Sequence, residues 1–206
     1  MAGDGGWLRQ TLLTSISSRL AVGLRQERSP RSQLKCSVVG QTDPFTERRM
    51  IRLVAMTQAE FVAFTERTIA TYAAEQRVAC GWSPEEAICN SREELARLLP
   101  AGLETPDQYL YTLTDEASGE PVGSLWFGVQ RRGETASAYL GELEIYPPHR
   151  RRGLGRAGML AAERQARALG CTTMSLNVFA HNEAAQALYR GLGFEVAALR
   201  MAKAFT

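Results

Sequence analysis

Apolar positions first recur at helical spacing in two stretches, each opened by a helix-capping pattern. The first opens with Thr57-x-x-Glu60, the pattern of a capping box, and predicts a helix over about residues 57–76. The second opens with Ser83-Pro84-Glu85-Glu86, where serine can cap the helix and proline fits its first position. This stretch predicts a second helix that ends near Leu99. The folded part of the chain therefore opens with two helices.

The apolar period then changes to two, the period of a β-strand. YLYTLTD, VGSLWFGVQ and SAYLGELEIY alternate in this way and are separated by turn residues, so they predict three successive antiparallel strands. Four further elements are expected: a helix over about 154–169, a strand TMSLNVF, a helix from Asn182 to Gly193 and a last strand FEVAALRMAKAF. This order of elements predicts a mixed α/β (α+β) fold.

Charge divides the chain into two parts. The whole chain has a net charge of +2. Residues 1–49 hold eight Lys/Arg and four Asp/Glu, whereas the residues after them carry a net charge of −2. The first part is rich in Arg and Ser, as organellar transit peptides are, but a disordered or vector-derived extension is the interpretation we favour. We therefore expect an extension over residues 1–49 and a folded domain over residues 50–206.

Composition excludes several classes of protein. At 206 residues and 45% apolar, the chain can bury a full core, yet no apolar run approaches the roughly 18 residues of a membrane helix. The cysteines are scattered without C-x-x-C spacing, and only two histidines could complete a metal site. We therefore expect reduced thiols in a cytoplasmic protein, without a metal. The net charge of −2 after residue 49 also argues against a nucleic-acid partner.

The segment HRRRGLGRAG contains Gly153-x-Gly155-x-x-Gly158, which matches the dinucleotide-binding pattern. Its context does not match, because PPHRRR separates the strand from Gly153 and no Asp or Glu occurs from Arg164 to Asn182. A P-loop is excluded as well, since no Lys-Ser or Lys-Thr follows the glycines. What remains is a glycine loop that opens a helix beside arginines, which suits an anionic, nucleotide-like cofactor.

Two motifs resemble those of the GNAT superfamily of N-acetyltransferases. Ile145-Tyr146-Pro147 followed by Arg150-x-x-Gly153-x-Gly155 is similar to the family's acetyl-CoA loop after its Val/Ile-x-Pro element. HNEAAQALYRGLGF, residues 181–194, is similar to the family's Asn-x-x-Ala-x-x-Leu-Tyr-x-x-x-Gly-Phe. The resemblance covers about residues 50–206. It implies a GNAT fold, in which helices flank a twisted mixed sheet whose central strands splay apart for acetyl-CoA.

The resemblance also assigns residues to acetyl-CoA. The strand end would pair with pantetheine, and the amides from Arg151 to Arg156 would hold the pyrophosphate, with arginine side chains adding charge. Asn182 would cap its helix, bind pantetheine or do both. The expected cofactor residues are Ile145, Tyr146, Arg150, Arg151, Arg152, Gly153, Leu154, Gly155, Arg156, Asn182, Ala185 and Tyr189. The arginines could instead form a solvated surface cluster or a nucleic-acid contact.

Acetyl transfer needs a neutral amine, so a carboxylate that accepts a proton is useful. Glu142 and Glu144 are two apart on a strand and share one face, and we place Glu144 slightly ahead of Glu142 as the base. Both could instead face solvent, or one could merely attract a cationic substrate. Tyr189 is the expected proton donor to the leaving thiolate, although it could serve only to pack its helix on the sheet.

We expect the segment from Trp82 to Gln108, together with Trp126, to wall the acceptor pocket, although such aromatic residues are often simply core. Asn177 stands where the ribosomal-protein N-terminal acetyltransferase branch often has a glutamate base, which speaks against that branch's peptide substrate. The expected reaction is direct transfer to a primary amine of a small molecule or peptide, and a homodimer is possible. The alternative is a non-catalytic acyl-CoA-binding sensor or interaction module.

Overall fold

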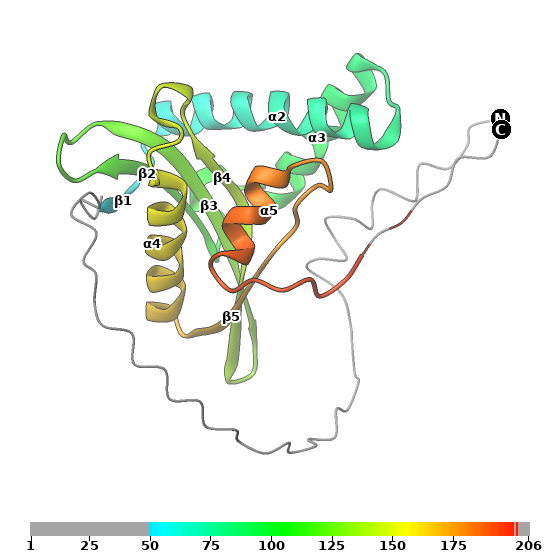
Figure 1. Ribbon diagram of the computed structural model, residues 1–206. Coiled ribbons are helices and arrows are strands. Elements are labelled where there is room, and N and C mark those ends of the chain that lie inside the picture. The colour runs from blue at the N-terminus through cyan, green and yellow to red at the C-terminus, as the bar shows by residue number, and fades with distance from the viewer. Residues whose placement is uncertain (1–49, 200, 202–206) are drawn as a thin grey trace. The chain divides into compact units, whose positions relative to one another are not determined.

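The computed structural model describes residues 50–199 and 201 (Figure 1), so the expectation for residues 1–49 lies outside the described residues. The strands are β1 (Ile51–Ala55), β2 (Gln108–Asp115), β3 (Pro121–Arg132), β4 (Thr135–Ile145) and β5 (Cys171–Leu176). The α-helices are α2 (Gln58–Cys80), α3 (Pro84–Leu98), α4 (Leu154–Ala168) and α5 (Glu183–Arg190). Short 3-10 turns occupy Gly102–Glu104 and Pro147–His149.

Both predicted capping boxes are formed. The Thr57 side chain accepts a hydrogen bond from the Glu60 amide at 3.3 Å, and the Glu60 carboxylate accepts one from the Thr57 amide at 2.8 Å. Ser83 and Glu86 make the same exchange at the start of α3. Helix α2 runs four residues past its predicted end, to Cys80. It ends there because Gly81, with φ of 69°, supplies the left-handed cap.

The strands form one sheet in the order β1-β2-β3-β4-β5. Every neighbouring pair is antiparallel except β4 and β5, which are parallel. Strand β1 was not predicted, because its five residues are too few to establish a period on their own. The predicted last strand is wrong over residues 194–199, which form no strand. Val196 and Leu199 remain 62% and 81% exposed there, so the alternation in this segment has no partner strand to bury it.

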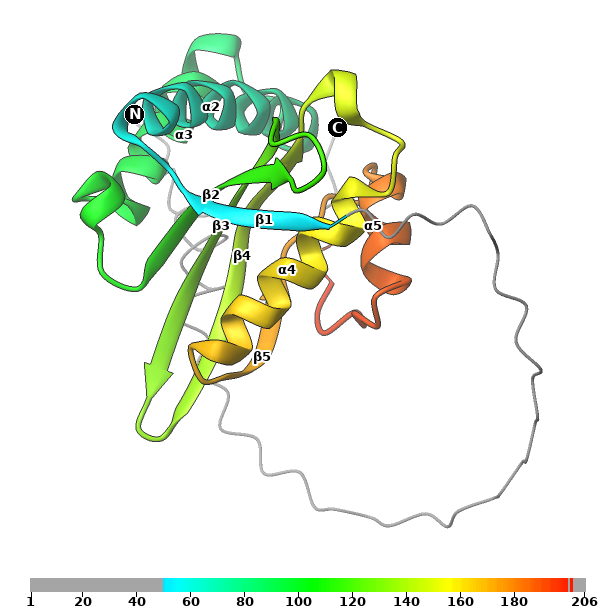
Figure 2. The same cartoon turned by 90° about the vertical axis from the view of Figure 1, so that its left-hand side faces the viewer.

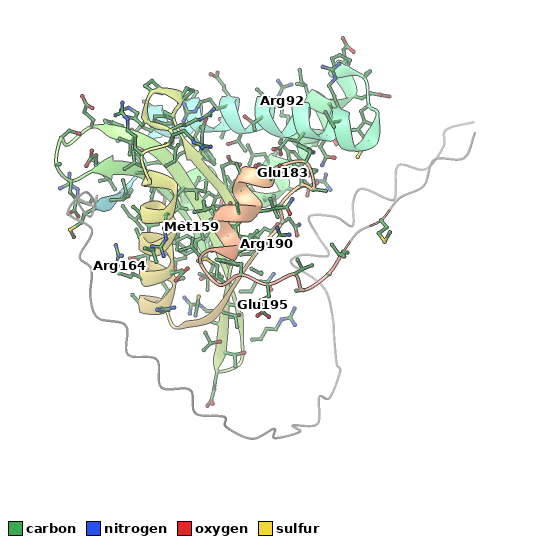
Figure 3. The ribbon with its side chains drawn as sticks, in the orientation of Figure 1. Arg92, Met159, Arg164, Glu183, Arg190 and Glu195 are labelled. Atoms are coloured by element: carbon green, nitrogen blue, oxygen red, sulfur yellow. The ribbon has the colours of Figure 1, made fainter. Side chains whose placement is uncertain are left out.

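Helices cover both faces of the sheet (Figures 1 and 2). Helix α4 packs on one face, where Met159 points inward and Arg164 of the same helix points away (Figure 3). Gly158 allows this close approach, since a Cβ there would lie 3.2 Å from a Leu113 methyl carbon. Helices α2 and α3 cover the other face, where Phe64 packs edge-on against Trp126. The mixed α/β fold is confirmed.

A β-bulge at Gly141 decides which way the end of β4 faces. Leu140 pairs with Phe127, whereas Glu142 pairs with Trp126, so Gly141 has no partner on β3. Leu140 belongs to the core beneath α4, and after the bulge it is Leu143 that packs against that core. The bulge therefore turns Glu142, and Glu144 two residues on, toward the face that α2 covers.

The central strands separate toward the carboxyl end of β4. Strand β4 pairs with β3 as far as Ile145, but its pairing with β5 stops at Leu140 opposite Leu176. Strand β5 itself ends at Leu176, three residues before the predicted end. The predicted splaying of the central strands is thus confirmed, and the last five residues of β4 have no partner on the β5 side.

Candidate active site

The end of β4 presents backbone groups toward the side that β5 has left. The Tyr146 amide donates to the Val122 carbonyl at 2.9 Å, on the β3 side. Because backbone groups alternate between the two edges of a strand, those of Leu143 and Ile145 face the opposite edge. The Ile145 carbonyl already has a partner, because Arg150 Nε donates to it at 2.8 Å. Arg150 therefore orders the loop after β4 as well as adding charge to it.

The loop before α4 ends in an uncapped helix start. Arg151 and Gly153 both have left-handed backbone conformations, with φ of 62° and 77°, and no side chain caps α4. The first helical acceptor is the Gly153 carbonyl, which takes the Ala157 amide at 3.1 Å. The amides of residues 154–156 therefore lack intrahelical acceptors, as expected for the first turn of a helix. Exposed arginines surround them, so the arrangement suits an anion.

The two sequence motifs meet at Gly155. A Cβ on Gly155 would lie 3.4 Å from a Leu188 methyl carbon of α5 and 3.9 Å from Ile145 Cγ1 of β4. The first turn of α4 and the middle of α5 therefore meet at the end of β4. Asn182 accepts a hydrogen bond from the Ala185 amide at 3.1 Å, so it caps α5 and occupies that amide.

Glu144 faces α2, where a guanidinium holds it. Arg67 Nε donates to Glu144 Oε2 at 3.1 Å. Arg67 Nη2 also donates to the Tyr146 hydroxyl at 3.1 Å, and its guanidinium carbon lies 4.9 Å from the centre of the Tyr146 ring. To accept a proton, Glu144 would have to give up much of this ion pair, which makes it the poorer candidate for a base.

Glu142 lies on the same face and has no hydrogen bond or ion pair to any described residue. Burial raises its pKa to about 7, with smaller contributions from the negative charges of Glu144 and Glu75. A carboxyl group with this pKa is partly ionised at neutral pH, and it accepts protons far more readily than an ordinary carboxylate. The surroundings of the two glutamates thus favour Glu142, whereas the sequence placed Glu144 slightly ahead.

Tyr189 of α5 lies within electrostatic reach of Glu142. Burial first, and then the charges of Glu142 and Glu75, raise the pKa of its phenol to about 12. The ring packs edge-on against Phe194 at 5.7 Å between centroids, so Tyr189 also has the packing role considered from the sequence. At neutral pH the hydroxyl keeps its proton and can donate it.

Sequence reasoning missed two charged residues of α2. Arg67 holds Glu144, and Glu75 acts on both Glu142 and Tyr189. They lie three and eleven residues after the buried Phe64, which places all three on one side of the helix. The sequence therefore held a signal for these two residues, because charged side chains are unusual on the side of a helix that packs against a sheet.

The two tryptophans occupy different settings. Trp126 is the β3 partner of Glu142 and is 6% exposed, and its indole N–H donates to Gln108 Oε1 at 2.7 Å. It therefore forms part of the core beneath Glu142. Trp82 is half-buried just after α2 and has no hydrogen bond or ring contact within the described part of the chain. Nothing in its contacts brings Trp82 to Glu142.

Residues 50–199 and 201 show neither a metal-binding cluster nor a membrane-spanning helix. No three Cys, His, Asp or Glu side chains of this part could together hold a metal ion. None of its helices combines the length and the apolar character needed to cross a bilayer. Cys80, Cys89 and Cys171 are free thiols.

We expect Glu142→Gln to stabilise the protein at alkaline pH. The pKa of Glu142 rises from 4.5 to about 7 on folding, so its contribution to stability is fully present below about pH 4.5 and is lost as pH rises through about 7. At about pH 8 the buried charge costs up to about 3 kcal/mol, which glutamine avoids. Thermal melting should show a higher Tm for the variant at about pH 8 and nearly equal values near about pH 4.5. Glu144→Gln, which loses the Arg67 ion pair, should give no such gain. A Glu142→Gln Tm at or below the parent's at about pH 8 would contradict the burial of this charge.

Comparison with known proteins agrees with this geometry. The model of the acetyltransferase (GNAT) family matches residues 68–194, more than half of the chain. The chain is similar to the uncharacterized N-acetyltransferase YycN of Bacillus subtilis, with 34% identity over 153 residues that cover 74% of this chain and 97% of YycN. It is 29% identical to the uncharacterized N-acetyltransferase YdgE of the same organism, over 72% of this chain and 94% of YdgE.

The crystal structure of YycN from Bacillus subtilis superposes with a TM-score of 0.72 at 33% identity, covering 76% of this chain and 99% of that one. Both signature segments of the sequence lie within the residues that the family model matches. Acetyl transfer is the activity that the family shares. The chain belongs to the GNAT family of acetyltransferases.

Proposed function

We propose that the protein transfers the acetyl group of acetyl-CoA directly to a primary amine while both are bound. The observation that carries this proposal is the setting of Glu142. It is an unpaired carboxyl group with a pKa of about 7, placed where β4 and β5 part and within electrostatic reach of Tyr189. A domain that only binds acyl-CoA has no need of such a base beside a protonated phenol.

The residues at the strand gap fit acetyl-CoA. The backbone groups of Leu143 and the Ile145 amide face the gap and suit the amides of pantetheine, as the missing strand would, whereas the Ile145 carbonyl accepts from Arg150. The uncapped amides at the start of α4 suit a pyrophosphate, and the exposed side chains of Arg151, Arg152 and Arg156 add positive charge. Acetyl-CoA bound in this way supplies an activated acyl group as a thioester.

Glu142 and Tyr189 divide the proton transfers between them. As the new C–N bond forms and the C–S bond breaks, an alkylammonium acceptor must lose two protons in all. Glu142 accepts one of them and releases it to water. Tyr189 donates a proton to the leaving thiolate, and the second proton from the nitrogen restores the phenol. Arg67 holds Glu144 in place, so its negative charge stays beside Glu142 and helps to keep the pKa of Glu142 high.

We place this reaction in the cytoplasm, because free thiols such as those of Cys80 and Cys89 suit a reducing compartment. The test is a panel of primary amines with acetyl-CoA, followed by release of free thiol and by mass spectrometry of the amine. Amine-dependent thiol release with an acetylated product supports the proposal. Acetyl-CoA binding without turnover of any amine would favour the acyl-CoA sensor instead.

Substitution of Gly155 tests the position of acetyl-CoA. A Cβ here would make ordinary contacts with Leu188 and Ile145, so alanine fits, whereas the two methyl groups of valine would fill the space between α4, α5 and β4. We expect Gly155→Val to weaken acetyl-CoA binding by about 10-fold or more in calorimetry, and Gly155→Ala to change it by less than about 3-fold. NAD should not bind measurably. Equal affinity in the valine variant would show that the cofactor lies elsewhere.

A further inference from the structure

The end of β4 that carries the proposed cofactor edge is paired on one side only. Strand β5 leaves β4 at Leu140, whereas β3 continues to Ile145, and the Tyr146 amide donates to the Val122 carbonyl on the same side at 2.9 Å. A strand end with one neighbour is held less firmly than a strand end with two. The direction of its open backbone groups therefore depends on what holds its side chains.

Arg67 of α2 holds two side chains of this strand end at once. Its Nε donates to Glu144 Oε2 and its Nη2 donates to the Tyr146 hydroxyl, each at 3.1 Å. Its guanidinium carbon also lies 4.9 Å from the centre of the Tyr146 ring. Glu144 and Tyr146 are two residues apart and project to the same face, so one planar guanidinium bridges them.

The opposite face of this strand end is held by the other half of the site. Ile145, between Glu144 and Tyr146, packs against the core that α4 covers. Its Cγ1 lies 3.9 Å from where a Cβ of Gly155, in the first turn of α4, would be. With Arg67 on one face and Ile145 on the other, the end of β4 is fixed between two layers of helix.

Helix α2 brings Arg67 to β4 in a fixed position. Glu60 Oε1 accepts a hydrogen bond from Thr112 Oγ1 of β2 at 2.8 Å, and Phe64 packs edge-on against Trp126 of β3 at 6.4 Å between ring centres. Arg67 follows these two residues at helical spacing, so it lies on the same side of α2. The helix therefore crosses the sheet from β2 to β4 with one anchored side chain on each strand.

We infer that Arg67 is a positioning residue for acetyl-CoA, because by bridging Glu144 and Tyr146 it fixes the edge of β4 that pairs with pantetheine. This inference rests on the proposed binding of acetyl-CoA at that edge, and it gives Arg67 a role beyond its effect on the charge of Glu144. The side chains of the Arg67–Glu144 pair are 37% and 21% exposed. Such pairs contribute little to global stability, so acetyl-CoA affinity should respond to Arg67 more than Tm does.

Replacement of Arg67 tests the bridge. Methionine keeps most of the stem of the side chain but neither donor, and we expect Arg67→Met to weaken acetyl-CoA binding by about 5- to 30-fold in calorimetry, with little change in Tm. Arg67→Lys presents one ammonium in place of the planar fork, so it should still bind at least about 3-fold more weakly than the parent. Arg77→Met, the same change at an exposed arginine of α2, should leave the affinity unchanged.

Two results with these variants would overturn the inference. Parent-like acetyl-CoA affinity in Arg67→Met would show that the edge of β4 needs no support from α2, and it would leave the proposed acetyl-CoA site standing. Full affinity in Arg67→Lys would show that the positive charge is sufficient and that the bridge is not needed.

A double-mutant cycle with Tyr146→Phe shows whether Arg67 acts through Tyr146. Phenylalanine removes only the hydroxyl that accepts from Arg67 Nη2. We expect Tyr146→Phe to weaken acetyl-CoA binding by about 3- to 10-fold in the parent, and by less than about 2-fold when residue 67 is already methionine. Losses that simply multiply would mean that the hydroxyl acts independently of Arg67, and would overturn the bridge. Tyr146→Phe also tests the inference by itself if Arg67→Met fails to fold, because unchanged affinity would then contradict it.

Calorimetry separates this inference from the proposed reaction, because it needs no acceptor. Weaker acetyl-CoA binding in Arg67→Met, together with no turnover of any amine by the parent, would support the role of Arg67 and overturn acetyl transfer to amines. No binding of acetyl-CoA to the parent would overturn both. With a responsive amine, KM for acetyl-CoA should rise in Arg67→Met, and an effect on kcat alone would overturn the positioning role.

Discussion

Glu142→Gln is expected to lower kcat/KM for a responsive amine by about 10²- to 10⁴-fold near neutral pH, the range typical of lost general-base catalysis. Glutamine keeps the size of the side chain and loses the ability to accept a proton. Alkylammonium groups have pKa values near 10.4, so without the base the enzyme must wait for the small neutral fraction of its substrate. Acetyl-CoA affinity should change little.

The pH profile shows whether this loss has the proposed cause. In the parent enzyme, kcat/KM should rise with pH until Glu142 is ionised, at about 7, and then level off. In Glu142→Gln it should keep rising toward the pKa of the amine, so the gap between the two narrows at alkaline pH. The comparison is Glu144→Gln, which removes the partner of Arg67 and one source of the raised pKa of Glu142.

We expect Glu144→Gln to shift the parent's profile to lower pH and to reduce its plateau by less than about 10-fold, because the base itself remains. If Glu144→Gln removed activity and Glu142→Gln did not, Glu144 would be the base, as the sequence had placed it. If both variants kept full activity, water would carry the proton and the site would act through proximity alone.

Tyr189→Phe should lower kcat by about 10- to 1,000-fold, the scale of a lost general acid. Only the hydroxyl is removed, so the edge-on contact with Phe194 survives and the fold and the acetyl-CoA affinity should stay close to those of the parent. The pKa of Tyr189 is about 12, so the loss should persist across the whole range in which activity can be measured. This distinguishes it from the Glu142→Gln loss, which shrinks at high pH.

Thermal melting and calorimetry control for a structural effect in Tyr189→Phe. A variant that melts like the parent, binds acetyl-CoA like the parent and turns over slowly supports the role of the hydroxyl. A variant with unchanged kcat would reduce Tyr189 to its packing role. Leaving-group dependence adds a second readout, because an acyl-CoA analogue with a more acidic thiol should suffer less from loss of the donor.

Local signals in the sequence were enough to predict most elements of the fold. Capping boxes at Thr57 and Ser83 start two helices, and Gly170 follows the helix that it was expected to stop. The last strand was wrong because alternation shows only that a segment could form a strand, whereas pairing depends on a neighbour. The short strand β1 was missed because its five residues set no clear period, and the partner that makes it a strand, β2, lies more than fifty residues away.

The residues of the active site were largely predictable from the sequence, but the better base of the two glutamates was not. Both glutamates were found because they share a strand face, yet the choice between them depends on Arg67, which is seventy-seven residues from Glu144 in the chain. The bulge that turns them toward α2 did leave a trace. The apolar positions of β4 change parity across Gly141, from Leu140 to Leu143, which is what one extra residue in a strand requires.

Titration of Glu142 shows directly whether this carboxyl group can act as the base, and it needs no knowledge of the acceptor. Carbon-13 NMR of the glutamate carboxyl groups, with Glu142→Gln for assignment, gives the pKa of this side chain in the folded protein. We expect one resonance with a midpoint at about 7 that is missing from the variant, and a lower midpoint for Glu142 in Glu75→Gln. A midpoint for Glu142 at the ordinary value near 4.5 would contradict its assignment as the base.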